Sequence, residues 1–256
     1  MRQTLVPKTP SARVYLLRIL PLLCLVLLWQ GLGGSVDQKL LPLPSLILGR
    51  LWQEASGDLW LHLGMTLARV AISFILAMTI GTALGIAMGL NQTVDKTLDT
   101  FLIIGMNIPA LVVIVICYIW FGLTEAAAVT AVTINKVPMV AVSLREGTRA
   151  LDHKLFDVAK VFKVSASDRL LKIIIPQLLP YLFGAIRNGL SIIWKIVLVV
   201  ELLGCSNGVG FQIGSFFHFF DLAGVLAYTL AFTLIVFMIE YLVIRPSERH
   251  LLRWRP

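Results

Sequence analysis

The sequence predicts an all-α membrane protein that crosses the bilayer about six times. Hydrophobic residues make up 58% of the chain and charged residues only 14%, whereas charged residues form about one-quarter of an average soluble domain. The mean hydropathy is +0.87. Apolar stretches of about 20 residues, the length that crosses a hydrocarbon core, recur along most of the chain and leave little room for a separate soluble domain.

Six apolar stretches approach the length of a spanning helix. They cover about 14–32, 63–90, 99–121, 124–143, 181–201 and 223–245. The first has Arg13 and Arg18 ahead of its apolar part, as a secretory signal does, but the later spans favour a retained anchor. We divide the chain into residues 1–55, an N-terminal anchor helix with an external loop, and residues 56–256, a core domain that includes a long loop at 144–180.

The basic residues indicate the orientation, because Lys and Arg accumulate on the cytoplasmic flanks of spanning helices. They cluster before the first span, after the last span and in the loop 144–180. The opposite side carries only Lys39 and Arg50. We therefore expect a multi-pass protein with both termini and the long loop in the cytosol. The net charge of +8 follows from this topology, so nucleic acid is not an expected partner.

Small residues and prolines mark special positions within the spans. Gly81, Gly85 and Gly89 recur every four residues, a stripe that lets another helix approach closely. Pro109 and Pro138 each remove a backbone donor, which predicts bends in the third and fourth spans.

Two segments between spans predict external structure. Glycines and prolines followed by a short amphipathic stretch at 33–61 predict an excursion near the membrane interface. A glycine turn followed by an aromatic-rich stretch at 201–220 predicts a re-entrant or interfacial helix.

Enzyme chemistry has no motif to support it. The chain lacks a G-x-x-x-x-G-K-[ST] phosphate loop, a G-x-S-x-G elbow and an H-E-x-x-H metal motif. Its four histidines are scattered, and Cys24, Cys117 and Cys205 show no metal-ligand spacing. We therefore expect no catalytic residue, metal or cofactor in this chain, and any ATP would be bound by a partner.

Ionisable residues inside spans are costly and by default suggest a transport pathway. The candidates for a pathway or gate are Arg69, Lys136, Lys195 and Glu201. A row of cations along the path would favour an anion. Alternatives stay open: Arg69 pairs with an outer carboxylate or reaches the interface, and Lys195 pairs with Glu240 or with Glu201 of a second copy.

The loop 144–180 has the pattern of two short helices. Leu155, Ala159 and Phe162 repeat at i, i+4 and i+7 while charged residues occupy the other faces. Ser165 followed three residues later by an acid predicts a helix start, and the second short helix is expected to end at Pro176. From periodicity alone, such a pair either docks in a groove of another protein or lies on lipid headgroups.

The loop resembles the E-A-A-x3-G-x9-I-x-L-P loop of permease subunits of ATP-binding-cassette importers. The matching positions are Asp157-Val158-Ala159, Lys163 and Ile173-Ile174-Ile175-Pro176. The spacing matches throughout, but Lys163 stands where the family has a glycine that makes the turn between the two helices. Further stretches are similar to the nitrate, sulfonate and taurine branch of that family: 62–70, 81–90, 120–122, 199–202, 208–210 and 251–254.

This resemblance implies a type I importer permease in the bacterial inner membrane. Its expected partners are a second copy of the permease, an ATPase dimer that binds ATP and Mg, and a periplasmic or lipid-anchored solute-binding protein. The residues expected to couple to the ATPase are Leu155, Asp157, Ala159, Lys160, Phe162, Lys163, Ser165 and Pro176. The expected solute is a small anion of the sulfonate, taurine or nitrate class, with an uncharged heterocycle or vitamin precursor as the alternative.

Two other functions compete with the importer. A transporter driven by an ion gradient would ordinarily show two related halves or an acidic residue at the midplane, and residues 1–128 and 129–256 show no repeat. A purely structural membrane anchor would not explain the long helical loop.

Overall fold

The computed structural model describes residues 12–35 and 37–251, and helices account for most of them. The helices are α1 (Ala12–Leu32), η1 (Gly33–Ser35), α2 (Pro44–Ala55), α3 (Leu59–Leu90), α4 (Gln92–Asn107), α5 (Ala110–Phe121), α6 (Glu125–Arg149), α7 (His153–Val161), α8 (Ala166–Arg169), η2 (Leu170–Ile174), α9 (Ile175–Gly204), α10 (Val209–His218), α11 (Leu222–Ile239), η3 (Glu240–Ile244) and α12 (Arg245–Leu251). Within the described ranges there is no β-strand, which confirms the all-α fold class.

Within residues 12–35 and 37–251, four helices are long and apolar enough to cross a bilayer: Leu59–Leu90, Glu125–Arg149, Ser167–Gly204 and Leu222–Leu251. The bent pair α4 and α5 makes a fifth crossing if it is counted as one span. The predicted first span lies on α1, of which Leu23–Leu32 is a shorter apolar stretch. Among the described residues the predicted stretches therefore fall on helices, four of them as long single spans.

The third predicted span is broken, and Pro109 is the reason. The axes of α4 and α5 differ by 99°, and Pro109 is the residue immediately before α5. The residue before a proline is pushed out of the helical region, and Ile108 has the extended angles φ −71° and ψ 125°. Pro138, by contrast, lies inside the continuous helix α6.

The expected helix end at Pro176 is wrong. The chain continues as one helix over Ser167–Gly204, in which the π-helical segment η2 joins α8 to α9. Pro176 lies in the first turn of α9, where a helix tolerates a missing N–H group. In the π-helical segment before the proline, hydrogen bonds join residues five apart instead of four. This local change in spacing lets the helix continue although Pro176 has no N–H group to donate.

Helices α3 and α6 pack with their backbones in contact, and the glycine stripe is the cause. A Cβ atom added at Gly85 would lie 2.5 Å from the carbonyl oxygen of Ala141 and 2.8 Å from Cβ of Leu144. Gly81 and Gly89 face Val140 and Thr148 in the same way. Side chains at these positions would force the two helices apart, so the structure confirms the prediction of close helix packing.

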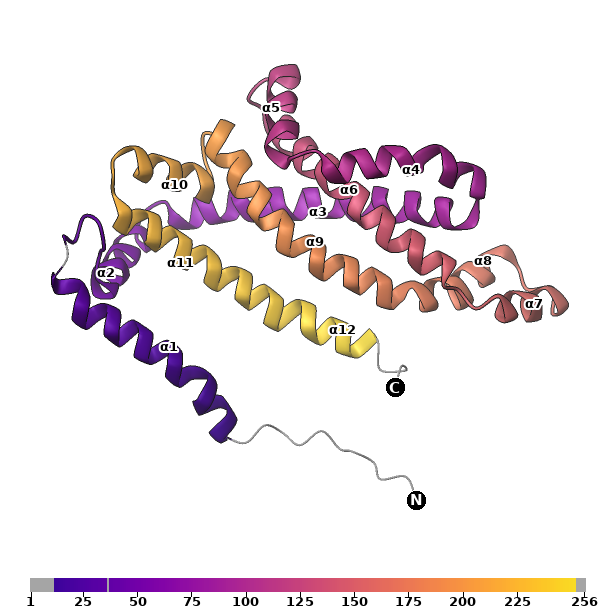
Figure 1. Cartoon of the computed structure of the whole chain (residues 1–256), viewed down its shortest axis with the longest axis horizontal. Coiled ribbons are helices and arrows are strands. Elements are labelled where there is room, and N and C mark those ends of the chain that lie inside the picture. Colours follow the sequence, from indigo (N-terminus) through magenta and orange to yellow (C-terminus); the bar gives the residue numbers. More distant parts are fainter. Residues whose placement is uncertain (1–11, 36, 252–256) are drawn as a thin grey trace.

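The ends of the helical body differ in what they carry (Figure 1). Helices α2 and α10 lie at one end, which we call the α10 end, and α7 and α8 project at the other, which we call the α7 end. At the α10 end, Nη2 of Arg50 on α2 lies 3.3 Å from Oδ2 of Asp221, and the Tyr228 hydroxyl donates to Glu54 over 3.3 Å. These contacts fasten α2 to α11.

Candidate functional site

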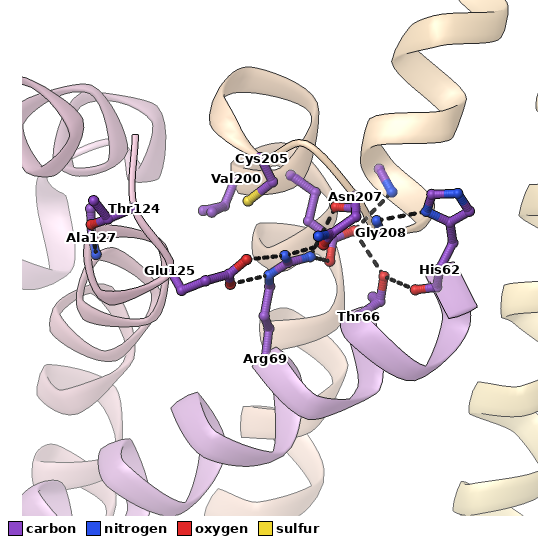
Figure 2. A network of polar contacts seen from close by, with 12 residues as sticks. His62, Thr66, Arg69, Thr124, Glu125, Ala127, Val200, Cys205, Asn207 and Gly208 are labelled. Atoms are coloured by element: carbon purple, nitrogen blue, oxygen red, sulfur yellow. Dashed lines mark hydrogen bonds and ion pairs between the residues drawn. The ribbon is translucent and has the colours of Figure 1, made fainter. Parts of the chain in front are cut away.

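A buried arginine organises the polar contacts at the α10 end (Figure 2). Only 3% of Arg69 on α3 is exposed. Its Nε and Nη2 atoms donate to Glu125 at the start of α6, and its Nη1 and Nη2 atoms donate to the backbone oxygen and the side chain of Asn207. Nη1 also donates to Glu201 over 2.6 Å. These contacts use all five N–H groups of a guanidinium, so Arg69 has no donor left for a solute.

Glu201 is the buried carboxylate of this group of residues, which we call the Arg69 network. It is fully buried near the end of α9. Its Oε2 atom accepts from the Thr66 hydroxyl over 2.9 Å and from the backbone N–H of Gly210 over 2.8 Å. A buried carboxylate is costly unless it is paired and hydrogen-bonded, and both requirements are met within one chain. Glu201 is therefore not available to pair with Lys195 of a second copy.

The same network closes the turn between α9 and α10. The N–H of Gly208 donates to Nδ1 of His62 over 3.0 Å, and the N–H of Val209 donates to the Thr66 hydroxyl over 2.8 Å. Gly208 has φ of 108°, and a Cβ atom there would lie 2.5 Å from Oε1 of Glu201. Two separate reasons thus require glycine at this position: the positive φ, and the lack of space for a Cβ atom beside the Glu201 carboxylate.

Sequence reasoning missed most of this network. It named Arg69 and Glu201 as pathway candidates and expected an outer carboxylate as one partner of Arg69, which the structure identifies as Glu125. Asn207 and the roles of His62 and Thr66 were not foreseen. One signal was available: His62, Thr66 and Arg69 recur at i, i+4 and i+7, which places three polar side chains on one face of an apolar helix.

The two lysine candidates lie in different surroundings. Lys136 on α6 is 2% exposed, and its Nζ atom lies 2.7 Å from the sulfur of Met139. Lys195 on α9 is exposed and lines a groove of about 420 Å³ between α9 and α11. Neither lysine takes part in an ion pair in the described part of the chain. The structure thus separates one enclosed lysine from one lysine that faces an open groove.

The expected coupling residues lie together at the α7 end. Helix α7 holds Leu155, Asp157, Ala159 and Lys160, and Phe162 and Lys163 follow it directly. Ala159 is only 4% exposed, whereas Phe162 is 74% exposed. The predicted apolar face is therefore divided, because one position packs within the chain and Phe162 faces outward.

The turn after α7 keeps the backbone of the family glycine although the residue differs. Lys163 has φ of 49°, in the left-handed region that favours glycine. The predicted helix start is confirmed, since the N–H of Asp168 donates to the Ser165 hydroxyl over 3.1 Å. A left-handed residue followed by a capped helix makes a tight reversal, so α7 and the start of α8, residues 153–169, form a compact projecting unit that we call the α7 unit.

Comparison with known proteins agrees with this geometry. Residues 77–244 match the family described as "Binding-protein-dependent transport system inner membrane component". An aliphatic sulfonates transport permease protein of Bacillus subtilis is 31% identical over 90% of this chain and 84% of its own length. The taurine transport system permease protein of Escherichia coli is 28% identical over 96% of this chain and 92% of its own length.

A solved structure supports the fold independently. The chain superposes on a chain of the MetNI methionine ABC transporter with a TM-score of 0.64 and 18% identity, covering 78% of this chain and 96% of that one. On these findings, the chain belongs to the family of inner-membrane permease components of binding-protein-dependent ATP-binding-cassette transporters, in the nitrate, sulfonate and taurine branch that its motifs predict.

Proposed function

We propose that this chain is the transmembrane subunit of an ATP-driven importer and that it moves a small anion of the sulfonate, taurine or nitrate class by alternating access. The observation that carries the proposal is the α7 unit. It projects from the end of the helical body opposite α10 (Figure 1), and it has the family spacing and a left-handed residue at the family's glycine position.

The α7 unit suits a docking role better than a lipid-lying one. Lys160, Phe162 and Lys163 are all exposed where α7 ends, so this segment offers a partner one aromatic ring and two cations. An aromatic side chain that is buried on binding is a common anchor of protein interfaces. The proposed partner is a cytoplasmic ATPase dimer, which holds ATP and Mg and carries out the hydrolysis.

The rest of the assembly follows from the family. A second copy of this chain completes the permease, and a periplasmic or lipid-anchored binding protein delivers the solute at the α10 end. Both termini then lie in the cytosol of a bacterial inner membrane, in agreement with the basic residues near them. ATP binding would close the ATPase dimer, and α7 would pass that movement to the spanning helices.

The proposal is tested by purification from the native membrane in mild detergent. We expect an ATPase subunit to co-purify with the unmodified chain, and proteoliposomes of that complex to take up solute only with ATP. The double charge reversal Lys160→Glu/Lys163→Glu is expected to reduce co-purification about tenfold or more. The two lysines are proposed to face acidic groups of the ATPase, and glutamates in their place would be repelled by those groups. Lys39→Glu, an exposed lysine far from the loop, is the matched control.

Two outcomes would contradict the proposal. If both lysine reversals leave assembly and uptake unchanged, the docking role of α7 is wrong. If uptake continues without ATP and stops when an ion gradient is collapsed, the chain is a secondary transporter.

A further inference from the structure

One face of α9 carries polar side chains that the protein does not cover. Asn188, Ser191 and Lys195 are all exposed, and their spacing of i, i+3 and i+7 places them on a single face. Polar groups in a spanning helix rarely face lipid, because burying them in hydrocarbon is costly. This face therefore lies against water or against another polar surface.

Lys195 has no carboxylate within ion-pair distance in the described part of the chain. Of the chain's 14 acidic residues, those in the predicted spans are Asp99, Glu125, Glu201 and Glu240. Each of the four already pairs with an arginine of the same chain. A second copy would bring the same four residues with the same arginines, so it supplies no free carboxylate. The carboxylates of the spans are thus already engaged by arginines, Glu240 in the same groove included, and an anion from outside the protein is the natural partner of Lys195.

The groove beside Lys195 has the composition of a site for a small anion. It is lined by the hydroxyl residues Ser191 and Thr233, and its volume of about 420 Å³ suits a small solute. Trp194 and Phe232 form part of its wall, with their rings 5.7 Å apart at 77°. Hydroxyls and an ammonium group bind an oxyanion, and the aromatic wall accepts a short apolar tail.

Charge within the groove also favours an anion. Arg187 and Glu240 line the groove too, and they neutralise each other: Glu240 lies 3.7 Å from Nε of Arg187, and Glu248 pairs with Arg187 as well. Lys195 is thus the uncompensated cation among the groove residues. Lys136 also lacks an acidic partner among the described residues, but at 2% exposure it is closed off from any solute.

We propose that the groove between α9 and α11 binds the oxyanion group of the transported solute, with Lys195 as its cation and Ser191 and Thr233 as neutral donors. This inference rests on the proposed function and names the solute class, a small organic monoanion such as an alkyl sulfonate. Lys195 lies nine residues before the end of α9, roughly 13 Å along the helix, so the site is within the spanning helix and not at its end.

The test uses cysteine labelling of the full complex in proteoliposomes, after Cys24, Cys117 and Cys205 are replaced by Ala. Thr233→Cys is expected to react with a sulfonate-bearing methanethiosulfonate, and ethanesulfonate is expected to slow that reaction.

Adding Lys195→Met should slow the reaction with the anionic reagent about tenfold, the effect of one charge-assisted hydrogen bond, and should abolish the protection by ethanesulfonate. A cationic reagent of the same size should not be slowed. Leu234→Cys, exposed on the same helix but outside the groove, should remain unprotected by ethanesulfonate.

A second measurement links the site to transport. Lys195→Met is expected to raise the KM for ethanesulfonate uptake about tenfold, while Lys195→Arg retains most of the affinity. Equal labelling by the anionic reagent with and without Lys195 would overturn the inference. Protection that appears only in phosphatidylglycerol vesicles and not in phosphatidylcholine vesicles would assign the anion to a lipid headgroup and would also overturn it.

Failure of the proposed function gives a different result. In that case the unmodified complex shows no ATP-driven uptake, whereas the labelling of Thr233→Cys still reports on the groove.

Discussion

The α10 end and the α7 end are stabilised in different ways. At the α10 end, buried polar groups from α3, α9 and the following turn, together with the exposed Glu125 of α6, complete one another's hydrogen bonds, and Arg69 uses every donor it has. At the α7 end, Phe162 is 74% exposed and Val161 is 78% exposed. The first region is complete within one chain, whereas the second presents apolar surface of the kind that a partner covers.

The largest effect on stability is expected when Arg69, the central cation of the α10 end, is removed. Arg69→Met leaves the fully buried Glu201 without its ion pair, and breaking a buried pair costs about 3–5 kcal/mol. We expect a matching loss of stability in thermal unfolding of the purified chain in detergent. The double variant Arg69→Met/Glu201→Leu should recover part of this loss, because it removes both charges. Wild-type stability of the single variant would mean that the network does not hold this end together.

The second test examines the region between the two ends, where backbone contact replaces hydrogen bonding. Gly85→Ala places a Cβ atom 2.5 Å from the carbonyl oxygen of Ala141, and overpacking of this kind costs about 1–3 kcal/mol. Gly64→Ala, on the same helix with no atom within 4 Å of the added Cβ, is the control and should not lower the stability. The same unfolding assay measures both. Equal effects at the two positions would contradict close packing as the role of the stripe.

The smallest effect is expected at the α7 end. Lys163 has φ of 49°, so Lys163→Gly should change the stability by about 1 kcal/mol or less. Lys163→Val should loosen the turn, because a β-branched residue strongly disfavours a positive φ. Hydrogen exchange of the backbone amides near residue 163 measures this, with faster exchange expected only for the valine variant. Faster exchange in the glycine variant as well would show that the lysine side chain itself holds the turn.

The sequence was most informative where the cause was local. Hydropathy identified the spanning stretches, the spacing of three glycines identified the α3–α6 contact, and Ser165 identified the start of α8. It was least informative where partners lie far apart in the chain. Arg69 meets Glu125 across 56 residues and Asn207 across 138, and no local pattern encodes such a pairing. Pro176 was misjudged because the π-helical segment that accommodates it has no clear signature in composition.

The uninterrupted helix from Ser167 to Gly204 has a mechanical consequence. Its 38 residues extend over roughly 57 Å, and it begins beside the α7 unit, carries Lys195 within its length and ends near Glu201. A tilt of about 5° around the centre of a rod this long displaces each tip by roughly 2–3 Å. A force that a partner ATPase applied at the start of this helix would thus move the groove at Lys195 and the turn after α9 at the same time, because one helix carries both.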